Sequence, residues 1–276
     1  MTTTVTNESL SSAIQELVQG LSVELGPIQP APELPSTEAA ISMLIDHTLL
    51  APNATLDQIR QVCAEAKQYQ TATVCVNSSM IPTVAAELDG SGVLPISVIG
   101  FPFGSSNTES KVLETRVACQ QGAKEIDMVN NIGLLRSGEF KAVFDDIKAV
   151  ADETHLHGDA KLKVILETAM LTRDEIIAAS YLACLAGSDF VKTSTGYGGP
   201  GAKPQDIRLM YEIATRTDLG WFNKKQVKAS GGIRSLETLQ TMVQNGATRV
   251  GASGTKAIIE QLRTGQAAST QASGNY

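Results

Sequence analysis

The chain has 276 residues, of which 42% are hydrophobic and 18% charged, so it can bury the core of one large domain. It contains no run of about 18 apolar residues that would predict a membrane span, and its N-terminus lacks the basic residues of a signal or transit peptide. The net charge is −7, but residues 1–50 hold six acidic and no basic side chains, so the remainder is nearly neutral. This balance argues against nucleic-acid binding through bulk charge.

The N-terminal segment differs from the rest of the chain. Residues 7–25 predict a weakly amphipathic helix, because Leu10, Ile14 and Leu17 recur at helical spacing. Residues 26–35 are rich in proline and predict an extended linker. We therefore treat residues 1–36 as an N-terminal extension and linker.

From residue 37 onward, strand and helix signals alternate. Short apolar runs predict eight strands, each followed by a helical stretch. This alternation predicts an α/β fold, a (β/α)8 TIM barrel over residues 37–265, with a doubly wound open sheet as the alternative. The predicted strands cover residues 45–48, 73–76, 96–100, 125–129, 162–166, 190–193, 226–229 and 248–250.

The helices between these strands have recognisable limits. Two capping boxes begin at Thr55 and Thr172, where a hydroxyl and a later amide or carboxylate satisfy free backbone N–H groups. Gly122, Gly187 and Gly246 each stand between a helix and the next strand, where a left-handed residue commonly ends a helix. The helices therefore alternate with the strands.

The cysteines and histidines indicate which kinds of disulfide, redox or metal site the chain can form. The four cysteines are far apart and form no CxxC motif, which is typical of reduced core thiols in a cytoplasmic protein. The chain has three histidines, of which His155 and His157 fall in a polar segment, so a metalloenzyme is a weak alternative. His47 and Cys75 are interpreted as structural rather than catalytic.

Two lysines end apolar runs that predict buried strands. Lys192 and Lys228 each pass directly into a segment rich in small residues and glycine. A buried ammonium group must be paired or must lose its proton, since its desolvation is costly. Two lysines on neighbouring strands would also repel each other. The pattern predicts that one of them is a free amine, the form that attacks a carbonyl to make a Schiff base.

Further polar residues lie at the ends of the predicted strands. Asp46, Asp127 and Glu167 join the two lysines there, and Lys163 shares a face of its strand with Glu167. Because the active site of such a barrel lies at the C-terminal ends of the strands, we expect Lys163, Lys192, Lys228, Asp127 and Glu167 to form one interior cluster. A structural ion-pair network is the alternative interpretation.

Glycine-rich segments follow the last three strands. Ser230-Gly231-Gly232 and Gly251-Ala252-Ser253-Gly254 occupy the two places where barrels bind phosphate through backbone N–H groups and a helix N-terminus. Residues 195–201 form a third glycine-rich loop, in which the backbone can approach a ligand closely. Simple turns are the alternative for either segment alone.

These residues and their order resemble the deoxyribose-phosphate aldolase family of class I aldolases, over about residues 40–260. The stretches that carry the resemblance are IDHTLL at 45–50, VCVN at 74–77, VIGFPFG at 98–104, EIDMV at 125–129, KVILET at 163–168, KTSTG at 192–196 and KASGGIR at 228–234. The resemblance implies a TIM barrel that reversibly cleaves 2-deoxy-D-ribose 5-phosphate to D-glyceraldehyde 3-phosphate and acetaldehyde, with neither metal nor cofactor.

The resemblance also implies roles for single residues. Lys192 is the Schiff-base lysine, and Asp127 and Lys228 form the pair that transfers protons and tunes its pKa. The family further implies a small phosphorylated sugar as substrate, no nucleic-acid or membrane partner, a cytoplasmic location and a homo-oligomer, either dimer or tetramer. The residues implied in substrate and phosphate binding are Thr195, Gly196, Gly231, Gly232, Gly251 and Ser253.

The polar tail, residues 266–276, is predicted to be flexible and ends in Tyr276. Some members of the resembled family use a terminal tyrosine in proton transfer. Tyr276 and Asp46 are therefore candidate proton relays, with an idle tail as the alternative.

The sequence departs from the family pattern at several positions, among them Ala51, Asn130 and Gly254, which concern substrate affinity more than chemistry. A pyridoxal-phosphate enzyme and a non-catalytic sensor of phosphosugars stay open as alternatives. Each would also bind phosphate, and the first would also use a lysine imine.

Overall fold

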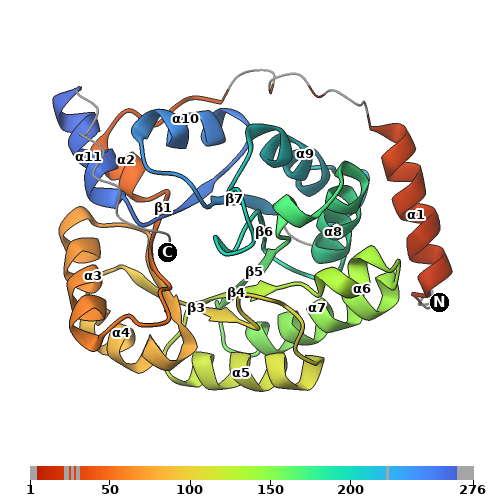
Figure 1. Ribbon diagram of the computed structural model, residues 1–276, viewed down its shortest axis with the longest axis horizontal. Coiled ribbons are helices and arrows are strands. Elements are labelled where there is room, and N and C mark those ends of the chain that lie inside the picture. Colours follow the sequence, from red (N-terminus) through yellow and green to blue (C-terminus); the bar gives the residue numbers. More distant parts are fainter. Residues whose placement is uncertain (1–4, 22–24, 26–27, 29–31, 222–223, 266–276) are drawn as a thin grey trace.

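The computed structural model describes residues 5–21, 25, 28, 32–221 and 224–265. Within them, eight parallel strands close into a barrel in chain order, and helices surround it (Figure 1). The predicted TIM barrel is confirmed, and the open-sheet alternative is excluded because β1 pairs with both β2 and β8. The strands are β1 Ile45–Leu49, β2 Thr73–Asn77, β3 Leu94–Ile99, β4 Glu125–Val129, β5 Lys161–Ile165, β6 Phe190–Lys192, β7 Gln226–Ser230 and β8 Arg249–Ala252.

The helices follow the strands as the sequence pattern predicts. Both predicted capping boxes are present, at Thr55 and at Thr172. Gly122, Gly187 and Gly246 all have positive φ, as their position after a helix requires. The helices of the barrel region are α2 Glu38–Ser42, α3 Leu56–Tyr69, α4 Ile81–Leu88, α5 Thr108–Gln120, α6 Ile132–Arg136, α7 Phe140–His155, α8 Arg173–Leu185, α9 Pro204–Ala214, α10 Leu236–Gln244 and α11 Thr255–Thr264, with short 3-10 turns at Ser78–Met80 and Thr168–Met170.

The N-terminal extension contains one helix, α1 Asn7–Gly20. It ends earlier than predicted because Leu21 is extended, and it lies against the outside of the barrel beside α7 and α8 (Figure 1). Its apolar face buries Leu10, Ile14 and Leu17. The side chain of Asn7 also bonds to the backbone of Gly138 and Lys141. The extension is therefore packed onto the outer helices.

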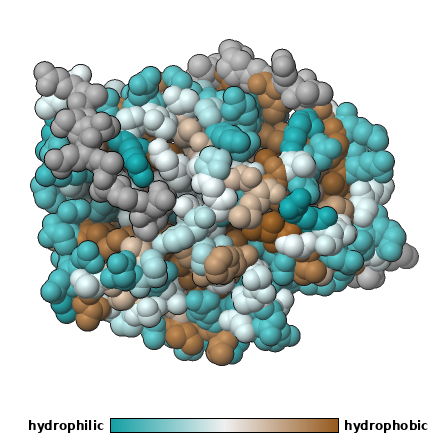
Figure 2. Space-filling view, viewed as in Figure 1, coloured by the Kyte–Doolittle hydropathy of each residue, from teal (hydrophilic) through white to brown (hydrophobic). Residues whose placement is uncertain are grey.

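The main hydrophobic core lies between the barrel and its helices, where the outward side chains of the strands meet the inner faces of the helices. On the face in Figure 2, hydrophilic side chains gather along the outer rim. None of the described helices has both the length and the apolar character that a membrane crossing requires.

The strand register positions the polar interior. Lys192 pairs with Lys228 between β6 and β7, and Asp127 pairs with Lys163 between β4 and β5. Asp46 in β1 pairs with Gly251 of β8, which closes the barrel. Paired residues on neighbouring parallel strands point to the same side, so these side chains share the inside of the barrel.

Candidate active site

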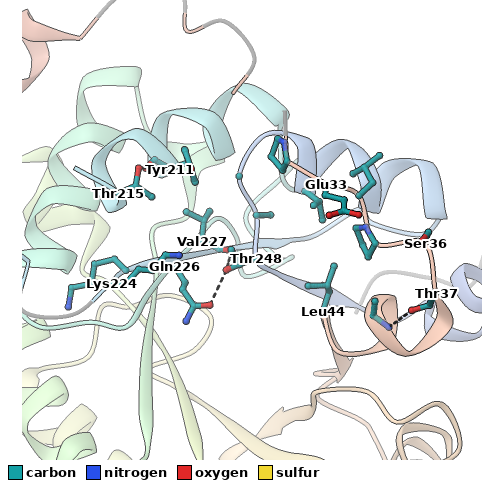
Figure 3. Close-up of a pocket in the computed structure, with 18 residues that line it drawn as sticks. Glu33, Ser36, Thr37, Leu44, Tyr211, Thr215, Lys224, Gln226, Val227 and Thr248 are labelled. Carbon is teal, nitrogen blue, oxygen red and sulfur yellow. Dashed lines mark hydrogen bonds between the residues drawn. The ribbon is translucent and has the colours of Figure 1, made fainter. Parts of the chain in front are cut away.

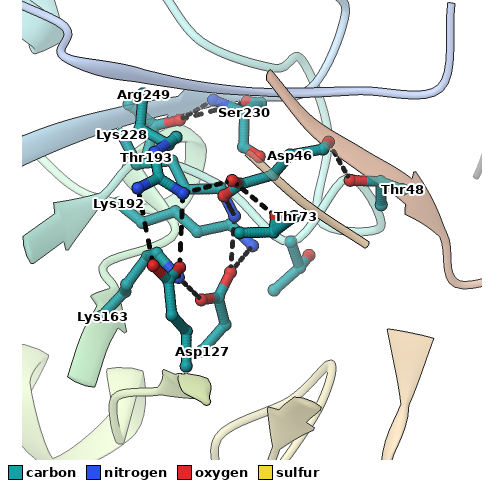
Figure 4. A network of polar contacts seen from close by, with 12 residues as sticks. Asp46, Thr48, Thr73, Asp127, Lys163, Lys192, Thr193, Lys228, Ser230 and Arg249 are labelled. Atoms are coloured by element: carbon teal, nitrogen blue, oxygen red, sulfur yellow. Dashed lines mark hydrogen bonds and ion pairs between the residues drawn. The ribbon is translucent and has the colours of Figure 1, made fainter. Parts of the chain in front are cut away.

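Lys192 and Lys228 meet at one carboxylate inside the barrel (Figure 4). The Nζ atoms lie 2.8 Å and 2.7 Å from Oδ2 of Asp127. The side chains of all three residues are almost completely buried. The register that sets β6 beside β7 brings the two lysines together, and β4 supplies the carboxylate across the interior. The predicted trio is therefore one contiguous group.

Asp127 is surrounded by cations. Its second oxygen, Oδ1, accepts a hydrogen bond from Lys163 Nζ at 2.8 Å. Burial alone would raise the pKa of Asp127, but Lys163, Lys192 and Lys228 together hold it well below its usual range. Asp127 is therefore an anion throughout the physiological pH range.

Lys228 lies between two carboxylates. Its Nζ is 2.5 Å from Oδ2 of Asp46 as well as 2.7 Å from Asp127. Burial would lower the pKa of Lys228, yet Asp127 and Asp46 outweigh burial and raise it. Lys228 is consequently a permanent positive charge beside Lys192.

Lys192 has the opposite balance. Burial lowers the pKa of its amine, the single contact with Asp127 opposes this, and the charge of Lys228 lowers the pKa further. The buried thiol of Cys75 lies close enough to interact electrostatically, and burial raises the pKa of that thiol to about 11. Lys192 is thus the lysine of the pair that most readily becomes a free amine, as the sequence pattern predicts.

The prediction that Glu167 belongs to the interior cluster is wrong. β5 ends at Ile165, and Glu167 has a left-handed backbone, φ 59°, that turns its side chain toward the loop after β6. Its carboxylate accepts hydrogen bonds from the backbone N–H and the hydroxyl of Thr195. Glu167 therefore orients this loop instead of balancing Lys163.

Two residues of the interior cluster were missed from sequence. Glu125 pairs with Lys163, and Arg249 lies 2.7 Å from Oδ1 of Asp46 and 3.4 Å from Oε2 of Glu125. Period-two alternation carried a signal for Glu125, because it stands two residues before Asp127 in β4 and shares its face. Asp46 itself also accepts a hydrogen bond from the Thr73 hydroxyl at 2.7 Å.

The glycine-rich loops converge beside this cluster. A Cβ added at Gly201 would lie 2.1 Å from the carbonyl oxygen of Gly231, and one added at Gly251 would lie 2.2 Å from the hydroxyl oxygen of Ser230. At Gly201 the contact is with backbone, so only glycine fits there, whereas at Gly251 a side chain would require the Ser230 hydroxyl to move. Gly196, Gly231 and Gly232 have positive φ, while Ser253 is exposed just before α11. Phosphate binding by these loops stays a prediction.

His47, which the sequence analysis interprets as structural, lies apart from the two lysines. His47 bonds to the Thr255 hydroxyl at 2.8 Å and to Glu65 at 3.0 Å, so it links β1 to two outer helices. Tyr276 lies outside the described residues, as does the rest of the segment 266–276.

A small apolar cluster forms the other side of the barrel interior. It consists of Leu50, Cys75, Ile96 and Val98, with Phe101 packed against it. Toward the barrel mouth, the ring of Tyr197 meets Phe101 edge to face, with centroids 5.6 Å apart, and the Tyr197 hydroxyl donates to the carbonyl of Leu50 at 3.0 Å. The loops after β1, β3 and β6 are thereby joined at this side.

A cavity of about 690 Å³ lies at the opposite end of the barrel (Figure 3). It is lined by residues 32–37 and by the segments that lead into β1, β7 and β8. Gln226 and Thr248 hydrogen-bond each other at its wall. Because active sites of such barrels lie at the C-terminal ends of the strands, this cavity is separate from the lysine site.

The carboxylates of the cluster are all engaged by cations. Among the described residues, no group of three or more His, Cys, Asp or Glu is arranged to hold a metal ion.

Comparison with known proteins places this geometry in a family. The model of the DeoC/LacD family of aldolases matches residues 40–259. The chain belongs to the DeoC/LacD aldolase family. A relative from the family, deoxyribose-phosphate aldolase 2 of Staphylococcus aureus strain MRSA252, is 49% identical over 219 residues, which cover 79% of this chain and 95% of the relative.

Solved structures agree with this membership. A crystal structure from Coccidioides immitis, assigned as a deoxyribose-phosphate aldolase, has a TM-score of 0.86 and 42% identity, and it covers 94% of this chain and 99% of its own. The tetrameric deoxyribose phosphate aldolase of Aeropyrum pernix has a TM-score of 0.75 and 29% identity, covering 83% and 93%. The likeness to the first structure extends beyond the residues that match the family model.

Proposed function

We propose that this protein is a deoxyribose-phosphate aldolase, EC 4.1.2.4, which reversibly cleaves 2-deoxy-D-ribose 5-phosphate to D-glyceraldehyde 3-phosphate and acetaldehyde through an imine on Lys192. The observation that carries the proposal is the buried amine of Lys192, which touches Asp127 beside the permanently charged Lys228. Its family membership and its 49% identity to a deoxyribose-phosphate aldolase support the choice of substrate.

The first step requires a neutral amine. An unperturbed lysine with a pKa of about 10.4 is unprotonated only about once in 2,500 at pH 7. Burial and the charge of Lys228 raise that fraction for Lys192. The amine then attacks C1 of the sugar aldehyde, and loss of water leaves an iminium, which withdraws electrons from the C2–C3 bond.

Cleavage removes one proton from the substrate, and a later step adds one proton to the enamine. The C3 hydroxyl loses its proton to Asp127, directly or through water, as the C2–C3 bond breaks and its electron pair forms the enamine. Protonation of the enamine at C2 and hydrolysis of the imine release acetaldehyde and restore the amine. The structure keeps Asp127 ionised, the form that accepts a proton.

The phosphate group is assigned to the loops after β6, β7 and β8. We place it near Thr195, Gly196, Gly231, Gly232, Gly251 and Ser253, where backbone N–H groups and the N-terminus of α11 offer positive partial charge. Both the backbone N–H and the hydroxyl of Thr195 are bonded to Glu167, so Thr195 would contribute by shaping the loop after β6.

Further proposals concern the limits of the catalytic domain, the cellular location and the oligomeric state. Residues 37–265 would form the catalytic domain, and the described cysteines, all free thiols, fit a cytoplasmic location. A homo-oligomer is supported by the tetrameric relative from Aeropyrum pernix.

Asp46 and Tyr276 are proposed as proton relays. For Tyr276→Phe we expect slower solvent-deuterium entry into acetaldehyde with intact imine formation, and an unchanged exchange rate would remove Tyr276 from the mechanism.

Reductive trapping tests the central proposal. Treatment with acetaldehyde and borohydride should add one ethyl group at Lys192, located by peptide mass spectrometry. The Lys192→Met variant serves as the blank. An adduct on Lys228 or Lys163, or none at all, would overturn the assignment. Turnover of deoxyribose phosphate in the same preparation, unchanged by excess chelator, separates this enzyme from a non-catalytic sensor and from a metalloenzyme.

A further inference from the structure

Six charged side chains inside the barrel form a closed ring of alternating sign, and Figure 4 labels all of them except Glu125. Following the contacts from Asp127, each carboxylate touches a cation on either side, and the last cation returns to Asp127. The ring is Asp127–Lys228–Asp46–Arg249–Glu125–Lys163–Asp127, with contacts of 2.7, 2.5, 2.7 and 3.4 Å for the first four, a Glu125–Lys163 ion pair, and 2.8 Å for the last. Three positive and three negative charges therefore cancel.

Lys192 is attached to this ring but is not a member of it. Its amine contacts Asp127 Oδ2, an oxygen that Lys228 also contacts. The groups that act electrostatically on its amine are Cys75 from β2, Asp127 from β4 and Lys228 from β7. A proton on Lys192 would be a seventh charge in a buried cluster that is already neutral, where an uncompensated charge is costly.

Arg249 closes the ring at the point farthest along it from Asp127. Its guanidinium contacts both Asp46 and Glu125 and lies 5.5 Å from the centre of the Phe190 ring. Burial would lower the pKa of Arg249, but Asp46 and Glu125 raise it, so the residue is charged at every pH of interest. Without this charge, Asp46 and Glu125 would each have one cationic partner fewer.

We propose that Arg249 is a positioning residue for the aldolase reaction, whose charge completes the neutral ring and thereby leaves Lys192 as the free amine. Loss of Arg249 leaves two cations against three carboxylates, and a protonated Lys192 then restores neutrality. Asp46 would also draw Lys228 away from Asp127, which leaves Asp127 freer to pair with a protonated Lys192. Arg249 acts on Lys192 through the carboxylates that lie between them, since the two side chains do not contact each other directly. The inference rests on the proposed role of Lys192.

The test compares the titration of Lys192 in the unmodified protein and in three variants. In Arg249→Leu, the midpoint should move to higher pH by about one unit, the size expected for one charge several ångströms away. In Glu125→Gln, which removes a negative charge, it should move to lower pH. In the double variant Arg249→Leu/Glu125→Gln, the charges balance again and the midpoint should return toward that of the unmodified protein. This return distinguishes charge balance from a purely structural role.

A matched control is available outside the barrel. Arg208 on α9 has 12% side-chain exposure against 14% for Arg249, pairs with Glu212, and lies 5.7 Å from the centre of the Tyr211 ring. Arg208→Leu removes a comparable guanidinium but should not shift the midpoint of the Lys192 titration. An equal shift in this variant would overturn the proposal.

Two readouts separate this inference from the proposed function. Competitive acetylation of Lys192 by acetic anhydride, followed across pH by peptide mass spectrometry, reports the amine without any need for turnover. The rising limb of kcat/KM against pH reports the same group only if Lys192 is the nucleophile. A folded Arg249→Leu with an unshifted acetylation midpoint would refute the inference. If Arg249→Leu does not fold, Glu125→Gln decides, and no downward shift in that variant would refute it equally.

Discussion

The two sides of the barrel interior differ sharply in chemistry. Strands β1 and β4–β8 supply the charged ring and Lys192, whereas β2 and β3 supply Cys75, Ile96 and Val98 to an apolar cluster. Apolar neighbours exclude water, and charges interact more strongly where water is excluded. Reactivity here depends on both sides, since the apolar side makes a surplus proton costly and the charged side determines which group gives it up.

The largest effect on catalysis is expected from Lys192→Met, which removes the nucleophile. Cleavage should fall by at least about a thousandfold, while stability should rise. Because burial lowers the pKa of Lys192 in the folded protein, the unfolded chain binds more protons between that lowered value and about 10.4, and stability of the unmodified protein rises with pH in this window. The variant should lack this slope in thermal unfolding followed across pH.

A matched substitution checks this expectation. Lys161→Met alters an exposed lysine at the start of β5 and should change neither cleavage nor the pH slope of stability. A Lys192→Met protein that is less stable than the unmodified protein near neutral pH would show that the lysine is not strained by burial.

The next largest effect is expected from Asp127→Asn, which keeps the shape of the side chain and removes its charge. Turnover should fall by about 10²–10⁴-fold, the usual contribution of a general acid or base. Imine trapping on Lys192 should be reduced less than turnover, because the amine is still present and the cation that faces it, Lys228, is retained. Equal losses in trapping and turnover would contradict a separate proton-transfer role.

A smaller effect on rate and a clear effect on pH dependence are expected from Lys228→Leu. The charge of Lys228 lowers the pKa of Lys192, so its removal should move the rising limb of activity to higher pH. Lys225→Leu is the control, because Lys225 is also buried but lies just before β7 at the opposite end of the strand. If Lys228→Leu had the same pH profile as the unmodified protein, the charge of Lys228 would not control the pKa of Lys192.

The smallest effect is expected on the apolar side. Ile96→Val removes one buried methylene, which typically costs about 0.5–1.5 kcal/mol, and thermal unfolding measures this loss. The pH profile of activity should stay in place, because no charge changes. A shift comparable to that of Lys228→Leu would show that the two sides are coupled through packing and would remove the distinction between them.

Much of this protein follows from its sequence because the informative signals are local. Alternation of short apolar runs with helical stretches predicted all eight strands, and capping boxes and glycines marked the helix limits. Lys192 and Lys228 stood out because a lysine at the end of a buried strand is rare and costly. These features depend on residues that are near neighbours along the chain.

Tertiary structure decided which charges meet. Glu167 turns away because the strand ends two residues before it, and its place beside Lys163 is taken by Glu125. Arg249 reaches Asp46 only because β8 pairs with β1, a contact between residues 203 positions apart. Neither the point at which a strand ends nor the register that closes a barrel is written in local periodicity. Both depend on the packing of distant strands, so only the folded barrel shows that the ring is complete and that Lys192 is outside it.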